Sequence, residues 1–284
     1  MKNKIKNSLK QMQKQSILKN LFRFTLTASF IYPLIKTLPV ESLDACPESN
    51  TSTSLDSYIS NGCYITPSKL KVTFFEIGFC TSDPLATGSF VSNSCSKSWD
   101  TNSTEGYQTD LGKKVFEQFT GNVYVVPNGT YTHAYAIMNN KWQYEGQYKI
   151  KDGDTYYTAS NGSVTTNIAS YATWEDDISN LVGEESPGTC FDYSMNTSNG
   201  SVSAVLADSS LVTATNTSTC NSATRVIGSV ALNSAVKMTD NVNGYQLEWK
   251  ITNTGLGITT TNTGDIVPQS FRGGPFTPKF TLIN

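Results

Sequence analysis

The chain has 284 residues, of which 15% are charged, and its formal net charge is −2 at pH 7. A chain of this length can bury one large core or two smaller ones. Its slightly acidic balance does not favour nucleic-acid binding, which rewards clustered Lys and Arg side chains, or docking on anionic lipid.

Residues 1–43 have the layout of a secretory signal peptide. The first 23 residues carry only basic charges, an apolar stretch of 12 residues follows at 24–35, and small residues then allow cleavage after Ser42 or, alternatively, after Ala45. The apolar stretch is shorter than the roughly 20 residues of a stable membrane span. We therefore expect export to the periplasm or extracellular space. The string Leu43–Cys46 also resembles a bacterial lipobox, so a lipidated Cys46 is the alternative membrane attachment.

Removal of the signal changes the charge and leaves all cysteines in the mature chain. Of 21 basic residues eight lie in 1–43, and of 23 acidic residues one does, so 13 basic and 22 acidic residues remain and the net charge is −9. Six cysteines behind an export signal predict three disulfides. We expect sequential pairing, with other connectivities open. The pairs are Cys46–Cys63, Cys80–Cys95 and Cys190–Cys220.

The first half of the mature chain predicts an arm followed by strands. Residues 44–62 are polar and read as an extended N-terminal arm, and residues 63–160 as a β-sandwich domain. Leu111 to Phe119 has helical spacing and predicts a short helix. Strands are expected at 71–79, 122–126, 131–137, 142–150 and 155–159. Asp152-Gly153 predicts a hairpin turn between the last two.

The segment Pro127-Asn128-Gly129-Thr130-Tyr131 resembles the Pro-x-Gly-Thr-Tyr strand start common in immunoglobulin-like and transthyretin-like β-sandwich domains. The resemblance covers about ten residues. It implies that Tyr131 forms a tyrosine corner, in which the hydroxyl bonds to backbone upstream. It also implies the setting in which such domains are frequent, namely exported surface proteins, adhesins and filament subunits.

The second half predicts a helical connector at 161–188 and a second β region at 189–284, either separate or part of the same sandwich. Thr173 and Asp176 suggest a capping box for a helix over 174–182 that ends at Gly183. Strands are expected at 201–206, 210–214, 225–232, 236–238, 245–251 and 276–283. The predicted fold class is mainly β, an antiparallel β-sandwich of immunoglobulin-like or jelly-roll-like type, with one or two packed sandwiches and one or two short helices.

Candidate site residues are few. An aromatic face could bind sugars or a partner, although most such rings in a sandwich belong to the core. That face comprises Tyr131, His133, Tyr135, Trp142, Tyr144 and Tyr148. His133 is the single histidine, so no multi-histidine zinc site is possible. Asp152 and Asp154 could share a calcium ion, but they lack a full EF-hand pattern; otherwise we expect no metal and no cofactor. Glu175-Asp176-Asp177 is interpreted as the acidic first turn of the expected helix.

These features favour a non-catalytic exported surface or extracellular structural protein, such as a filament, sheath or coat subunit or an adhesive module. Its expected partners are other copies of itself, surface proteins or glycans. The arm at 44–62 would suit strand addition to a neighbouring copy. The alternative is a carbohydrate-binding protein or a glycan-active enzyme, but the sequence shows no recognisable catalytic set.

Overall fold

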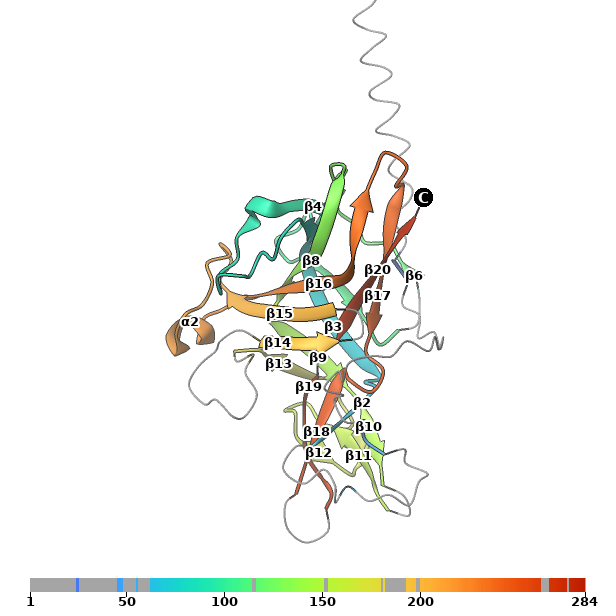
Figure 1. The fold of residues 1–284 in the computed structure, drawn as a ribbon. Helices are drawn as coiled ribbons and strands as arrows, with labels where there is room; N and C mark the ends of the chain where they lie inside the picture. The colour runs from blue at the N-terminus through green and yellow to red at the C-terminus, as the bar shows by residue number, and fades with distance from the viewer. Residues whose placement is uncertain are drawn as a thin grey trace, which may run out of the picture.

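The computed structural model describes residues 24–25, 45–47, 55, 62–113, 116–150, 153–179, 181, 193–197, 200–261, 266–274 and 276–283. These residues form a mainly β fold of antiparallel sheets, as the sequence predicts (Figure 1). The expected signal segment lies outside them except for Phe24–Thr25, and so do Asp152 and Cys190.

A ten-stranded sheet forms the body of the molecule. Its main path runs β13 (Trp174–Asp177), β9 (Lys141–Glu145), β3 (Lys69–Cys80), β8 (Gly129–Asn139), β16 (Arg225–Met238), β15 (Gly200–Ala207) and β14 (Tyr193–Thr197). Beside this path, β4 (Cys95–Asp100) and β5 (Tyr107–Asp110) pair with β3, and β7 (Asn122–Val123) pairs with β4. Both halves of the mature chain therefore contribute strands to one sheet.

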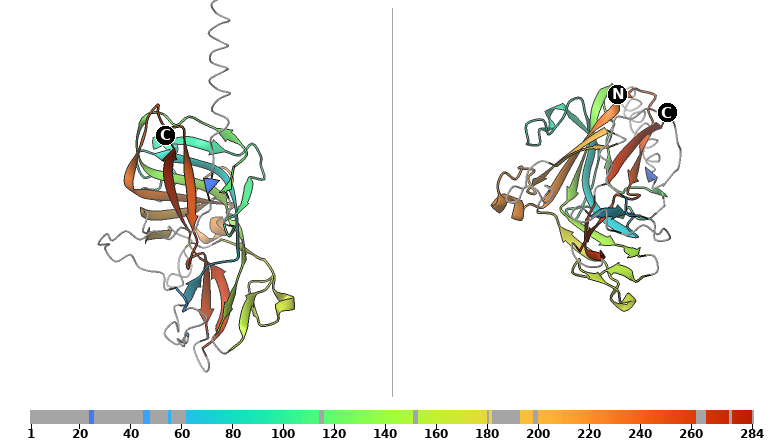
Figure 2. Two further views of the ribbon diagram at one scale, coloured as in Figure 1. Left: turned by 90° about the vertical axis from the view of Figure 1, so that its right-hand side faces the viewer. Right: turned by 60° about the horizontal axis from the view of Figure 1, so that its bottom comes forward.

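Smaller sheets surround this body. They are β17 (Gly244–Lys250) with β20 (Thr277–Ile283); β19 (Pro268–Gly273), β18 (Leu256–Thr260) and β2 (Cys63–Ile65); β10 (Gln147–Lys149), β11 (Thr155–Thr158) and β12 (Val164–Thr165); and β1 (Phe24–Thr25) with β6 (Phe116–Glu117). Figures 1 and 2 show the β17–β20 pair lying across one face of the large sheet. The helical elements in the described part of the chain are η3 (Ser92–Ser94), η4 (Ile168–Ser170) and α2 (Thr217–Asn221).

The two faces of the large sheet have separate cores because side chains alternate along a strand. On one face Ala134, Ala204 and Val226 join the main core cluster beneath β17 and β20. On the other, Tyr135 and Ile227 belong to a second cluster with Cys80 and Leu85.

Several predicted elements are confirmed. The Tyr131 hydroxyl donates to the Pro127 carbonyl oxygen at 3.0 Å, which is the local contact expected of a tyrosine corner. β10 and β11 form the hairpin expected around Asp152-Gly153. The runs at 225–232 and 236–238 are one strand, β16, with an irregularity between Ala231 and Val236.

The two predicted helices are wrong. Where a helix over 174–182 is predicted, Trp174–Asp177 form strand β13 and pair with β9 from Tyr144 to Lys141, and residues 180 and 182 lie outside the described residues. Trp174 is buried and Asp176 half-buried while Glu175 and Asp177 are exposed, which is strand alternation. In the region of Leu111 to Phe119, Asp110 accepts hydrogen bonds from the backbone of Leu70 and Gly112 and fixes a turn.

The run at 210–214 is also not a strand. It is a turn with an isolated bridge between Ala207 and Thr213, and Leu211 has a φ of 65°. The helix α2 that follows is not predicted from the sequence. It begins with a capping box, in which Asn216 is the N-cap and Thr219 the N3 residue.

Two of the expected disulfides are present, Cys46–Cys63 and Cys80–Cys95. Cys220 is disulfide-bonded as well. The described residues of the expected arm lie against the body rather than away from it. The backbone N–H of Cys46 donates a hydrogen bond to the Tyr64 carbonyl, and the Tyr148 hydroxyl donates one to the Pro47 carbonyl at 3.0 Å. Leu55 is buried in the main core.

Candidate functional site: an apolar cavity with one polar end

A cavity of about 400 Å³ lies between the large sheet and the β17–β20 pair. Its lining comes from residues far apart in sequence, on β8, β9, β13, β15 and β16 below and on β17, β19 and β20 above. The volume falls within the range of about 300–1,000 Å³ that is usual for small-molecule sites.

The floor is apolar and hollow because three neighbouring strands place small residues side by side. Gly228 on β16 is the cross-strand partner of both Ala204 on β15 and Ala136 on β8. Residues paired in this way stand about 5 Å apart on the same face. Three positions in a row therefore carry no side chain beyond Cβ, and the sheet surface is depressed there.

The roof consists of two cross-strand pairs, Leu247 with Phe280 and Trp249 with Pro278. All four residues line the cavity. Aromatic contacts fix the roof: the rings of Trp249 and Phe276 have centroids 5.2 Å apart in an edge-to-face arrangement. Large apolar side chains of the roof therefore face small residues of the floor, and the space between them stays unfilled.

One end of the cavity is polar. Tyr144 on β9 is fully buried, and its hydroxyl has no hydrogen-bond partner among the described residues. A Cβ placed on Gly273 would lie 2.5 Å from this hydroxyl oxygen and 3.3 Å from Oδ2 of Asp176. Tyr144, Asp176 and Gly273 all line the cavity, and the two side chains pack against the bare backbone of Gly273, where no larger residue would fit.

The electrostatics of this end follow from burial. Burial raises the pKa of the Asp176 carboxyl above its ordinary value, the neighbouring charge of Asp177 raises it further, and the backbone N–H of Gly273 opposes the rise. Burial, with the nearby Asp176 charge, holds the pKa of Tyr144 well above its ordinary value. The tyrosine is therefore a neutral hydroxyl at every physiological pH.

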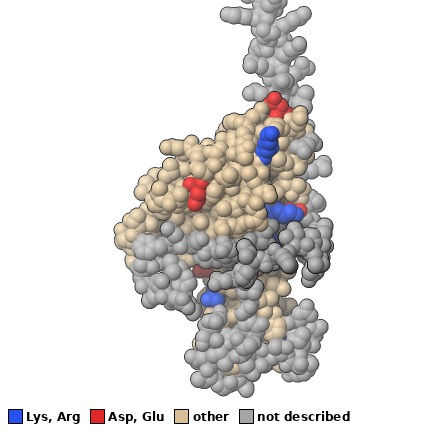
Figure 3. Space-filling model, in the orientation of Figure 1, with Lys and Arg blue, Asp and Glu red and all other residues tan. Residues whose placement is uncertain are grey.

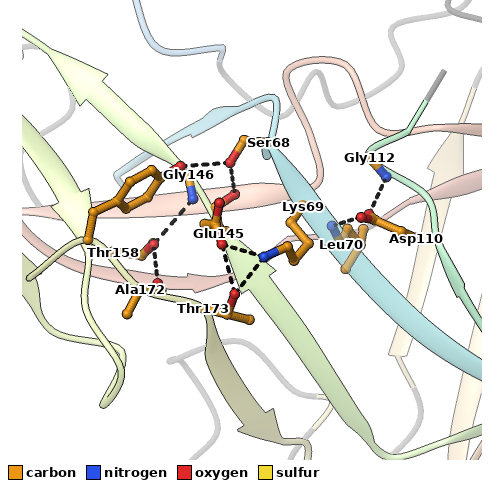
Figure 4. Close-up of polar contacts among 11 residues, drawn as sticks. Ser68, Lys69, Leu70, Asp110, Gly112, Glu145, Gly146, Thr158, Ala172 and Thr173 are labelled. Carbon is orange, nitrogen blue, oxygen red and sulfur yellow. Dashed lines mark hydrogen bonds and ion pairs between the residues drawn. The ribbon is translucent and has the colours of Figure 1, made fainter.

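A polar network on the far side of β9 positions Tyr144 and Asp176 (Figure 4). Lys69 lies 2.5 Å from Glu145 and donates to Thr173 at 2.8 Å, and Thr173 donates to Glu145 at 2.7 Å. Burial alone would raise the pKa of Glu145, but the Lys69 and Thr173 hydrogen bonds and the Lys69 charge lower it below its ordinary value. Because Glu145 follows Tyr144 and Thr173 precedes β13, the network fixes both strands that carry the polar end.

The aromatic residues predicted to form a binding face do not form an exposed platform, because five of them are 9% exposed or less. Those five are Tyr131, Tyr135, Trp142, Tyr144 and Tyr148. Instead, Trp142 and Tyr144 line the cavity, Tyr131 and Tyr148 lie elsewhere in the main core, and the Tyr135 ring belongs to the second cluster on the opposite face of the sheet.

The other predicted site residues lie away from the cavity lining. His133, half-buried on β8, bonds through Nδ1 to the Thr132 hydroxyl at 2.9 Å. The calcium candidate Asp154 lies at the β10–β11 hairpin, and its expected co-ligand Asp152 is outside the described residues. In the described part of the chain, no group of three His, Cys, Asp or Glu side chains could hold a metal ion.

The floor and part of the polar end do not follow from the predicted elements. The sequence predicts Ala136, Ala204 and Gly228 only as strand residues, although their small side chains at alternating strand positions are a visible signal. Asp176 was noted, but as part of a helix. Gly273 belongs to β19, which had not been predicted.

Comparisons with protein-family models, curated proteins and solved structures found no match to this chain. No helix in the described ranges is both long and apolar enough to span a membrane. The two disulfides indicate an oxidising environment of extracellular type.

Proposed function

We propose that this protein is an exported, non-catalytic surface or extracellular protein that binds an apolar small molecule in the cavity under β17 and β20. The observation that carries the proposal is the row of Ala204, Gly228 and Ala136 facing the roof of Leu247, Trp249, Pro278 and Phe280. A sandwich interior normally packs as densely as an organic crystal. Space left by three adjacent small residues loses those packing contacts, and an apolar ligand would restore them.

The chemistry of the lining supports binding rather than reaction. The floor and roof offer only hydrocarbon and aromatic surface, and Asp176 and Tyr144 meet at one end. The face drawn in Figure 3 offers little to a charged partner, since its described part has only scattered charged side chains. The disulfides support the export part of the proposal. A sugar-binding platform has no such support, because the rings expected to form it are buried.

The test fills the floor and measures binding of butylbenzene, an apolar probe without a polar group. Ala136→Ile and Ala204→Ile each add three carbons to the floor, whereas Ala235→Ile adds the same carbons at an exposed position of β16 outside the lining. We expect the wild type and Ala235→Ile to bind alike, and the two floor variants to bind at least about tenfold more weakly, because the loss of about 1.4 kcal/mol of packing is tenfold in affinity.

Thermal unfolding of the same variants separates occupation of the cavity from damage to the fold. Ala136→Ile and Ala204→Ile should unfold at or above the wild-type temperature, because their side chains enter empty space. A wild type that does not bind butylbenzene, or stable floor variants that bind it unchanged, would overturn the proposed function.

A further inference from the structure

We propose that the ligand is an amphipathic amine, an apolar molecule with one ammonium group, and that this group pairs with the Asp176 carboxylate at the polar end of the cavity. The inference rests on the proposed function, since it assumes that the apolar part of the ligand occupies the cavity under β17 and β20. It adds the chemical class of the ligand and the residue that selects it.

The first argument is that Asp176 makes no ion pair in the described structure. It is half-buried and lines the cavity, and its carboxylate accepts a hydrogen bond from the backbone N–H of Gly273. Burial raises the pKa of this carboxyl, so the charged form is disfavoured where it stands. A cation that enters the cavity would stabilise the charged form, because a charge removed from water requires a partner.

The second argument separates Asp176 from its two acidic neighbours. Side chains alternate along β13, so Glu175 and Asp177 are exposed and lie outside the cavity lining. Both also have polar partners, since Gln143 donates to Glu175 at 3.2 Å and Asn140 donates to Asp177 at 2.7 Å. Of the three acids of β13, Asp176 alone lines the cavity.

The third argument is the chemistry of the surfaces beside the carboxylate. The cross-strand partner of Asp176 is Trp142 on β9, and Ile178 lies two residues further along the chain. Both of these residues line the cavity with Asp176. An indole ring next to a carboxylate suits an ammonium group, because the ring face attracts cations and the carboxylate supplies the opposite charge.

The charge of Arg272 is directed away from Asp176. Gly273 faces Asp176, and successive residues of a strand face opposite sides, so Arg272 leaves β19 on the other side. Its side chain extends across Gly257, lies 5.5 Å from the centre of the Tyr64 ring and donates to the Tyr64 hydroxyl at 3.4 Å. An anionic ligand group at the polar end would instead meet the like charge of Asp176.

The experiment measures dissociation constants for four related probes: butylbenzene, para-butylbenzylamine, para-butylbenzyl alcohol and para-butylbenzoate. In neutral buffer the amine is a cation, the alcohol is uncharged and the benzoate is an anion. Asp176→Asn removes the charge and keeps an acceptor for the Gly273 N–H. The matched control is Asp177→Asn, which removes the same charge from the next residue, outside the lining.

The wild type should bind the amine at least about tenfold more tightly than the alcohol, and it should bind the benzoate most weakly of the three. Asp176→Asn should remove the preference for the amine. It should leave butylbenzene binding unchanged, which would show that the cavity is intact. Asp177→Asn should keep the preference, because its exposed charge is screened by solvent.

The outcomes separate the two proposals. If no probe binds, both are overturned. If butylbenzene binds and the amine gains nothing over the alcohol, or if the benzoate binds most tightly, the apolar function stands and the amine assignment is wrong. If both Asn variants lose the preference equally, the attraction is a general effect of charge near β13 and the assignment to Asp176 is overturned. The wild-type comparison decides the ligand class even if Asp176→Asn fails to fold.

Discussion

The Tyr144 hydroxyl is destabilising in the ligand-free protein. It is fully buried and close to Asp176, and it makes no hydrogen bond within the described structure. A hydroxyl removed from water without a new partner destabilises a protein by roughly 1–3 kcal/mol. A residue that serves only packing would do better as phenylalanine, which keeps the stacked contact with Trp174 at 5.1 Å.

Tyr144→Phe is therefore expected to raise the free energy of unfolding of the ligand-free protein by about 1 kcal/mol. Urea denaturation measures this value. Tyr148→Phe should have the opposite effect, because its hydroxyl bonds to Pro47 and that bond would be lost. A destabilised Tyr144→Phe would show that the hydroxyl has a partner in the folded protein.

Single residues were predictable where the signal was local. Tyr131 lies four residues after Pro127, whose carbonyl accepts its hydrogen bond, and the sequence Pro127-Asn128-Gly129 predicts the turn between them. Tyr135, Trp142 and Tyr144 were recognised as aromatic strand residues, but alternation does not say whether a second sheet covers a given face. The β17–β20 pair lies over the face that carries Trp142 and Tyr144, and its residues are 100 or more positions further along the chain.

At the scale of elements, β13 shows how tertiary pairing overrides local propensity. Thr173 and Asp176 have the spacing of a capping box, yet the segment pairs over four residues with β9. The Thr173 hydroxyl that would have capped a helix bonds instead to Glu145 at 2.7 Å. The strand conformation places Asp176, rather than Asp177, toward the cavity, so the polar end depends on this pairing.

Lys69→Met tests the contribution of the network that holds β9 and β13. We expect a loss of about 1 kcal/mol at pH 7, a modest value because both Lys69 and Glu145 are partly exposed. The pKa of Glu145 is lowered in the folded state, so its contribution is present above its ordinary pKa of 4.5 and is lost as the pH falls through the folded value.

The difference in stability between Lys69→Met and the wild type should therefore shrink below about pH 4.5, which urea titrations at several pH values would detect. Lys141→Met is the control. Its pair with Asp177 is 3.8 Å long and exposed on both sides, so its removal should change stability by less than about 0.5 kcal/mol at any pH. An equal effect of the two substitutions would contradict the assigned role of Lys69.

At the scale of the whole molecule, the mainly β class was predictable because alternating runs and turn residues mark strands locally. The cavity was not predictable, because it depends on pairings between strands that are far apart in the sequence. β2 pairs with β18 across most of the chain, and β8 pairs with β16. The depression exists only because the register of β8, β16 and β15 sets Ala136, Gly228 and Ala204 in a row. A shift of β16 by one residue would replace Gly228 in this row by Ile227 or Ser229.

The disulfides bear on the whole fold, because Cys46–Cys63 ties the N-terminal segment to β2 and Cys80–Cys95 joins β3 to β4 within the large sheet. Cys46–Cys63 spans 17 residues and Cys80–Cys95 spans 15, and loops of this length correspond to about 3 kcal/mol each. The total stability of a domain is commonly only about 5–15 kcal/mol. Paired Cys→Ser variants should therefore each lower the unfolding free energy by about 3 kcal/mol, as urea denaturation would show.

The two bridges should differ in their effect on ligand binding. Cys46–Cys63 holds β2, whose Tyr64 lines the cavity, whereas Cys80–Cys95 lies on the opposite face of the large sheet. Loss of the first should weaken butylbenzene binding as well as stability, and loss of the second should lower stability alone. If both variants kept the wild-type stability, the fold would have no physical dependence on an oxidising compartment, and the argument for export would rest on the N-terminal segment.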